Sequence, residues 1–135
     1  MLRLAAIPLL LALFLGGCAN GAAEQEQVRQ QLMVRSQALN SRNLPLYLTT
    51  ISARYNDRGR DYAALRDSLE ASFKIFESVS YQAGAQKVAI SGNKAEVSGE
   101  YRMRVVIRGK EMSLDGREHI WLAREAGGWK IIAGL

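Results

Sequence analysis

The chain has 135 residues, of which 48% are hydrophobic and 23% are charged, and its formal net charge is +5. This composition is typical of one globular domain, and it excludes a long disordered chain and a collagen-like repeat. One Cys cannot form a disulfide within the chain, and one Cys with one His cannot complete a Cys/His zinc cage, so the fold must rest on its own hydrophobic core.

The N-terminal segment has the layout of a secretory signal. Arg3 precedes an apolar run of 12 residues from Leu4 to Leu15, which contains Pro8. A helix needs about 20 apolar residues to cross the hydrocarbon core of a bilayer, so this run predicts a cleaved signal and not a permanent membrane span.

The segment Leu15-Gly16-Gly17-Cys18 resembles the lipobox of bacterial lipoproteins, where an aliphatic residue and two small ones precede the lipidated Cys. This resemblance implies a signal peptide over residues 1–17, cleavage between Gly17 and Cys18, and anchoring in a lipid bilayer by fatty acyl chains such as palmitate on Cys18. Ala19, in place of the Asp that retains many lipoproteins at the inner membrane, implies the periplasmic face of the outer membrane in a Gram-negative cell envelope. A Gram-positive membrane stays open, and so does a plain secretory signal.

Residues 18–23 are predicted to form a lipidated tether, and the domain is predicted over residues 24–135. A first helix is expected over about 24–41, because Val28, Leu32 and Leu39 lie near one face. A second helix is expected from the cap residue Asn43, with an apolar stripe through Leu44, Tyr47, Leu48, Ile51 and Tyr55.

A third helix is expected from the cap residue Asp61 to about Phe76, after a loop over residues 56–60. From there on the pattern is strand-like, with strands expected over about 79–90, 94–107, 111–125 and 129–134. Gly84, Gly99 and Gly116 fall inside these strands and predict bulges or bends. Helices followed by a strongly curved antiparallel sheet make an α+β domain.

This order of elements, and a last hairpin from Trp121 to Ile132 that contains Gly127-Gly128-Trp129-Lys130-Ile131, resemble the nuclear transport factor 2-like superfamily, also called SnoaL-like or the cystatin-like cone. The resemblance spans residues 24–135 and implies N-terminal helices packed on a cone-like sheet. The superfamily often has a short strand between its helices, and none is evident between Ser52 and Asp61. Its members include enzymes as well as noncatalytic binding domains, so the fold does not name a function.

Enzymes with this fold use a carboxylate or His inside the cone as general base, and His119 is the only His available. Whether its strand face points inward is open, because the opposite register, with Ile120 and Leu122 inward, fits the sequence equally well. No catalytic residue is therefore assigned, and Asp57 is interpreted as a turn residue. The residues predicted to line a pocket are Tyr47, Tyr55, Tyr101, Met103, His119, Trp121 and Trp129.

Basic residues gather at two places, Arg54, Arg58 and Arg60 in one and Arg102, Arg104 and Arg108 in the other. They are interpreted as solvated faces, with attraction to anionic lipid headgroups as the alternative. Nucleic acid is not expected as a partner, because an export signal separates the protein from it. Phosphate-loop, zinc and calcium spacings are missing, so neither a cofactor nor a metal is predicted.

Two functions remain. The favoured one is a noncatalytic envelope lipoprotein that binds a small apolar ligand or a protein partner. The alternative is a small hydratase- or isomerase-like enzyme with its active site inside the cone. A homodimer through the outer face of the sheet is a further expectation, because Val106 and Ile132 interrupt otherwise polar faces.

Overall fold

The structure, a computed structural model, describes the backbone of residues 17–135 and the side chains from Gly21 onward. The predicted signal peptide, apart from Gly17, lies outside the described residues, and so does the side chain of Cys18. Among the helices of residues 17–135, none is both long and apolar enough to cross a membrane.

The first helix, α1 (Gly17–Ser41), begins earlier than expected and includes the residues predicted as a tether. Its Ala-, Gln- and Glu-rich sequence favours a helix. The expected apolar positions Val28, Leu32 and Leu39 are buried. The helix ends in a Schellman motif, in which Arg42 takes a φ of 51° and the Asn43 amide donates to the Ala38 carbonyl at 2.8 Å.

The second helix, α2 (Leu44–Leu48), is much shorter than the stripe to Tyr55 predicts, so that prediction is wrong. Asn43 caps it as expected, since its side chain accepts from the Leu46 amide. The chain then leaves the helix to pair with the last strand. The Ser52 amide donates to the Ile131 carbonyl at 2.9 Å, and the Ile131 amide to the Thr50 carbonyl at 2.8 Å.

A small hairpin, β1 (Asn56–Asp57) and β2 (Arg60–Asp61), follows and corrects the expectation that no strand lies before Asp61. Arg58 and Gly59, with φ of 53° and 86°, form its turn. The third helix, α3 (Tyr62–Ile75), starts where predicted, because the Asp61 side chain accepts from the Ala64 amide at 2.9 Å.

The sheet is antiparallel in the order β3 (Ser78–Ser91), β4 (Lys94–Ile107), β5 (Lys110–Glu125) and β6 (Gly128–Ala133), which confirms the predicted strands and the α+β class. The register shifts between Ala83 and Gln86, so the bulge expected near Gly84 is present. Gly99 lies opposite it, where a Cβ would come within 2.8 Å of the Ala85 carbonyl oxygen. The close approach of the strands therefore requires glycine at this position.

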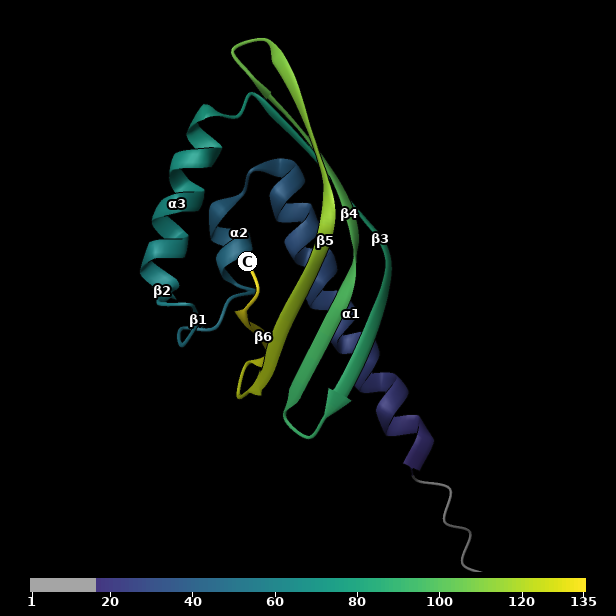
Figure 1. Cartoon of the computed structure of the whole chain (residues 1–135). Coiled ribbons are helices and arrows are strands. Elements are labelled where there is room, and N and C mark those ends of the chain that lie inside the picture. The colour runs from purple at the N-terminus through teal and green to yellow at the C-terminus, as the bar shows by residue number, and fades with distance from the viewer. Residues whose placement is uncertain (1–16) are drawn as a thin grey trace, which may run out of the picture.

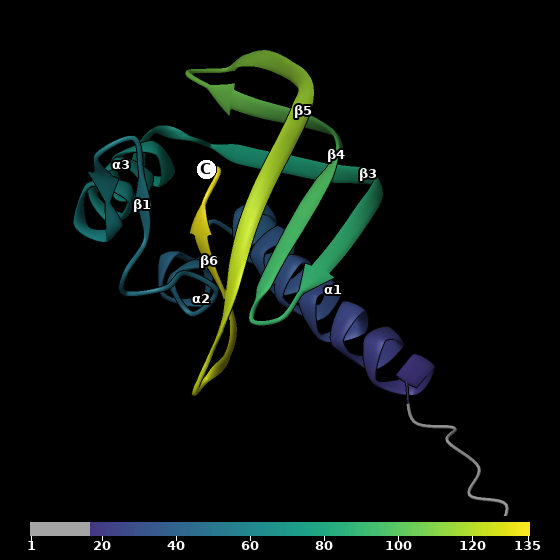
Figure 2. The ribbon, with the colours of Figure 1, turned by 60° about the horizontal axis from the view of Figure 1, so that its bottom comes forward.

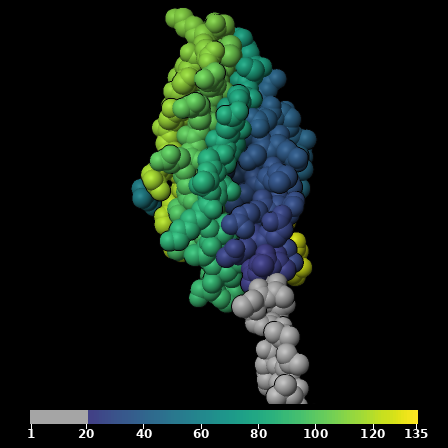
Figure 3. Space-filling view, turned by 90° about the vertical axis from the view of Figure 1, so that its right-hand side faces the viewer, coloured from purple at the N-terminus to yellow at the C-terminus, as the bar shows by residue number. Residues whose placement is uncertain are grey.

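The three helices lie on the inner side of the curved sheet (Figure 1). In Figure 2 the chain ends between α3 and β5, and Figure 3 shows α1 beside the sheet along its length. The far ends of β4 and β5, residues 101–116, form a curved hairpin that we call the arm. Its tip extends beyond the helices (Figure 1). The core lies between α1, α2 and the inner face, and its fully buried members include Val28, Tyr55, Leu65, Val97, Ile120, Leu122 and Ile131.

Candidate functional site

The inner side of the cone holds a buried charged group, Arg35 of α1, that shares a helix face with Val28, Leu32 and Leu39. Its Nε donates to the Tyr47 hydroxyl at 3.2 Å, and its Nη1 donates to the Tyr81 hydroxyl at 3.3 Å. The same Nη1 lies 3.2 Å from Glu118 Oε2. Arg35 thereby joins α1, α2, β3 and β5.

Glu118 completes this network, because its second oxygen, Oε1, accepts a hydrogen bond from the Tyr81 hydroxyl. The side chains of Arg35 and Glu118 are only 9% and 11% exposed. A buried ion pair is stable only if its remaining polar atoms find partners, and both carboxylate oxygens have one here. The four residues Arg35, Tyr47, Tyr81 and Glu118 are called the inner network below.

The contacts of the inner network keep Arg35 charged and Tyr81 neutral. Burial by itself lowers the pKa of Arg35, but Tyr47, Glu118 and Tyr81 together raise it above the usual value, so the guanidinium stays charged. Burial raises the pKa of the Tyr81 hydroxyl, Arg35 opposes this shift, and the bond to Glu118 adds to it. Tyr81 therefore stays a neutral donor, and Glu118 has no unpartnered oxygen to act as a base.

The structure places five of the seven predicted pocket residues on the inner side. Tyr47, Tyr55 and Trp129 are core residues, while Tyr101 and Met103 are partly buried against the core. The Tyr55 hydroxyl exchanges hydrogen bonds with the backbone of Leu135, and burial raises the pKa of this hydroxyl.

The other two, His119 and Trp121, point to the outer face, so the seven residues do not form one pocket. Side chains alternate along a strand, and Ile120 and Leu122 of β5 are fully buried. The inward register is therefore the one with Ile120 and Leu122. His119 Nε2 contacts Glu96, and its half-exposed ring stacks on Trp121 with centroids 5.0 Å apart.

Arg35, Tyr81 and Glu118 were not predicted as site residues from the sequence. A signal was present for Arg35, which lies seven positions after Val28 on the buried stripe. Glu118 lies two positions before Ile120, but the sequence left open which face of that strand points inward. Because these residues are polar, a search for apolar residues at helix or strand spacing does not detect them. Among the side chains that the structure describes, residues 21–135, no group of three or more His, Cys, Asp and Glu is arranged to hold a metal ion.

The outer face of β4 and β5 is polar and its charges pair across the strands. Arg102 lies 3.2 Å from Asp115, Arg104 lies 3.8 Å from Glu111, and Arg117 lies 3.5 Å from Glu100. These side chains are exposed, so the interpretation of Arg102 and Arg104 as a solvated face is confirmed. Arg58 and Arg108 are exposed as well, and Arg60 donates to the Leu135 carbonyl.

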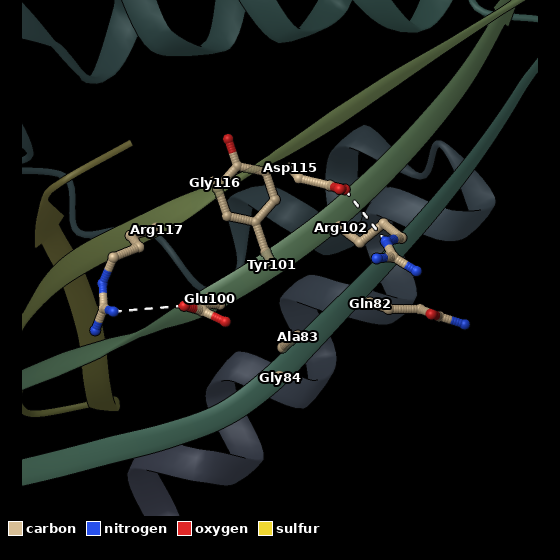
Figure 4. Close-up of a pocket in the computed structure, with 9 residues that line it drawn as sticks. All are labelled: Gln82, Ala83, Gly84, Glu100, Tyr101, Arg102, Asp115, Gly116 and Arg117. Carbon is tan, nitrogen blue, oxygen red and sulfur yellow. Dashed lines mark hydrogen bonds and ion pairs between the residues drawn. The ribbon is translucent and has the colours of Figure 1, made fainter.

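A groove of about 530 Å³ crosses the bend of β3, β4 and β5, and the Arg102–Asp115 and Arg117–Glu100 pairs lie along it (Figure 4). Its lining residues are Gln82, Ala83, Gly84, Glu100, Tyr101, Arg102, Asp115, Gly116 and Arg117. Because each charge already has a partner of opposite sign, the groove offers a ligand no net charge.

The inner face of the arm is apolar. Met103 is paired with Leu114 and Val105 with Met112, so these four side chains share one face. Met112 and Leu114 are each 50% exposed. An exposed apolar surface beside a cone is suited to bind an apolar ligand or partner.

No family model and no curated protein matches this chain. Solved structures do match it. A protein of Novosphingobium aromaticivorans, named provisionally as a scytalone dehydratase, aligns with a TM-score of 0.79 at 12% identity and covers 87% of this chain and 85% of its own.

A nuclear transport factor 2-like superfamily protein of Salmonella enterica has a TM-score of 0.75 at 16% identity, over 85% of this chain and 89% of its own. A protein of Streptomyces avermitilis, named provisionally as a dehydratase of the same family, has a TM-score of 0.75 at 11% identity. The alignment covers 84% of this chain and 94% of that protein. At these identities the likeness is one of fold, the nuclear transport factor 2-like cone.

Proposed function

We propose that this chain is a lipid-anchored, noncatalytic protein of the bacterial cell envelope that binds a small apolar ligand on the inner face of the arm. The single observation that carries the binding part is the pairing of Met103 with Leu114 and of Val105 with Met112, which leaves half-exposed Met112 and Leu114 beside the cone. A protein partner with an apolar segment would use the same surface.

The noncatalytic part is supported by the inner network. A general base must be free to accept a proton from substrate. Glu118 instead accepts from Arg35 and Tyr81, and His119 lies on the opposite side of the sheet. The polar groups of the inner network bond to one another, so their arrangement is that of a structural cluster.

Fluorescence of 1-anilinonaphthalene-8-sulfonate, with dodecanoate as a competitor, tests the binding. We expect the wild-type protein to enhance the dye's emission, dodecanoate to reverse the enhancement, and Leu114→Glu to abolish it. Ser113→Glu is the matched control, because it adds the same charge to the next residue, whose side chain is on the other face. Equal dye binding by all three proteins would contradict the proposal, and dye binding that dodecanoate does not reverse would favour a protein partner.

The anchor is supported by the resemblance of residues 15–18 to a lipobox. Acylation with more than one chain gives stable membrane attachment, whereas one chain alone is marginal. In a cell that processes lipoproteins, Cys18→Ser is expected to move the protein from the membrane to the soluble fraction. Ala19→Ser, a neighbouring change that keeps the thiol, is expected to leave it in the membrane.

A second candidate is a hydratase- or isomerase-like enzyme inside the cone, and the names of two fold neighbours favour it. Its acid–base residues would be Glu118 and Tyr81, since these lie on the inner side. Turnover of scytalone by the wild-type protein, lost in Glu118→Gln and kept in His119→Gln, would establish this enzyme. If the folded wild-type protein does not turn over scytalone, the result favours the noncatalytic function.

A further inference from the structure

Trp121 lies beside His119 on the outer face of β5 and lines a groove that is separate from the inner face of the arm. This groove has a volume of about 690 Å³, within the range of small-molecule sites. Its lining residues are Arg54, Asn56, Lys94, Trp121, Ala123, Ile132 and Ala133.

Trp121 presents one open ring face to this groove. It is 41% exposed, whereas Trp129, the other Trp, is 2% exposed. Along β5, His119 and Ala123 flank Trp121 on the same side of the strand. The His119 ring stacks on the indole at an interplanar angle of 16° and is itself in contact with Glu96, so one face is covered. Ala123 has only a methyl group, so no long side chain of β5 covers the second face of the indole.

The groove also carries basic side chains. Lys94 and Arg54 line it, and no acidic side chain does. Arg54 is 82% exposed and lies 3.3 Å from Glu125, so its charge is already paired. Lys94 is exposed and makes no ion pair among residues 21–135, so it supplies the free positive charge. Asn56 adds an amide that can both donate and accept hydrogen bonds. A ligand that fits these groups has a flat apolar ring face, hydroxyl groups and a negative charge.

We propose that this groove binds a pyranose sugar that carries a carboxylate. The C–H face of the ring lies on the open face of Trp121, which is large, rigid and apolar. The carboxylate lies between Lys94 and Arg54, and ring hydroxyls bond to Asn56 or to water, because the groove is open. The site is on the opposite side of the sheet from the arm's apolar surface, so it is independent of the apolar ligand.

Calorimetry with two sugars tests the proposal directly. N-acetylmuramic acid and N-acetylglucosamine share a ring, and only the first carries a carboxylate. We expect the acid to bind about fivefold more tightly, as one or two exposed ion pairs allow, and the difference to shrink with added salt. Trp121→Ala is expected to weaken binding of both sugars about tenfold.

Matched variants locate the site. Lys94→Gln is expected to bring the two affinities within about twofold of each other. Lys110→Gln, at the first residue of β5 and far from the groove, is expected to keep the difference. Sugar is expected to change Trp emission in the wild-type protein and in Trp129→Phe, but not in Trp121→Phe. Glucuronic acid binding as tightly as N-acetylmuramic acid would support an acidic sugar in general.

Three results would overturn the proposal. They are equal binding of both sugars by the wild-type protein, tighter binding of benzoate than of either sugar, and no binding at all. A Trp121 emission that changes with protein concentration alone, together with a dimeric mass, would assign the groove to a second copy of this chain and would overturn it as well.

Discussion

Arg35 of α1 and Glu118 of β5 form a buried ion pair with 3.2 Å between Nη1 and Oε2. Either partner alone would destabilise the folded state, because a buried charge without a counter-charge is strongly unfavourable. The two hydroxyls of Tyr47 and Tyr81 satisfy further atoms of the pair. The pair thus fixes the position of α1 on the inner face of the sheet.

Glu118→Gln is expected to lower the free energy of unfolding by about 3 kcal/mol, since it leaves the Arg35 guanidinium buried without a counter-charge. Urea denaturation measures the change. The double variant Arg35→Met/Glu118→Leu is expected to recover part of this loss, because no buried charge remains, and to stay below wild type, because the buried Tyr47 and Tyr81 hydroxyls lose their partners. Glu100→Gln, in an exposed pair, is the control and should cost less than about 1 kcal/mol. A double variant as unstable as Glu118→Gln would contradict this view of the pair.

Alkaline pH is expected to destabilise the fold through Tyr81. Burial raises the pKa of the Tyr81 hydroxyl in the folded state, and the bond to Glu118 raises it further, although Arg35 lowers it in part. Above the unfolded value of about 10, the unfolded chain loses a proton that the folded chain keeps, so stability is full below that pH and falls above it. Unfolding temperatures between pH 8 and 11 measure this. The unfolding temperature of Tyr81→Phe should fall less steeply with pH than that of wild type. An unchanged slope would exclude Tyr81 as a source of the destabilisation.

Two Gly→Ala substitutions are expected to act in opposite directions. At Gly99 a Cβ would meet the Ala85 carbonyl oxygen at 2.8 Å, so Gly99→Ala should destabilise the sheet by about 2 kcal/mol. Gly21 lies in α1 with nothing within 4 Å of the added Cβ, so Gly21→Ala should stabilise by about 0.5 kcal/mol. Thermal unfolding measures the stability change of both variants. Stabilisation by Gly99→Ala would contradict the expectation, since it would mean that the bulge of β3 can move away from the added Cβ.

Asn40 protects the free edge of the sheet. Its side chain accepts from the Tyr81 amide at 2.6 Å and donates to the Tyr81 carbonyl at 3.2 Å. Asn40→Ala leaves both backbone groups without that partner and is expected to cost about 2 kcal/mol. Hydrogen exchange at the Tyr81 amide should then be faster. Asn43→Ala, which removes the α2 cap, should leave that amide protected; if both variants expose it equally, Asn40 has no local role.

The sequence predicted the elements whose signals are local. The cap residues Asn43 and Asp61 predicted the starts of α2 and α3, and the alternation of polar and apolar residues predicted the strands. Both patterns depend only on residues that are close in sequence. The predicted length of α2 was wrong because the backbone of Thr50 and Ser52 bonds to Ile131 of β6, which is distant in sequence. Two-residue strands such as β1 carry no alternation and so could not be seen.

The candidate site was harder to predict for the same reason. The inward direction of β5 depends on pairing with β4 and β6, and only the structure places Glu118 inward and His119 outward. Arg35 was recoverable from its position on the buried stripe of α1. Its partners were not, because they come from three other elements that meet only in the folded chain.

The mass of the intact protein, extracted from membranes of cells that process lipoproteins, tests the account most directly. We expect a chain that begins at Cys18 and carries three fatty acyl groups. A chain of full length with an unmodified thiol, recovered from the soluble fraction, would contradict it.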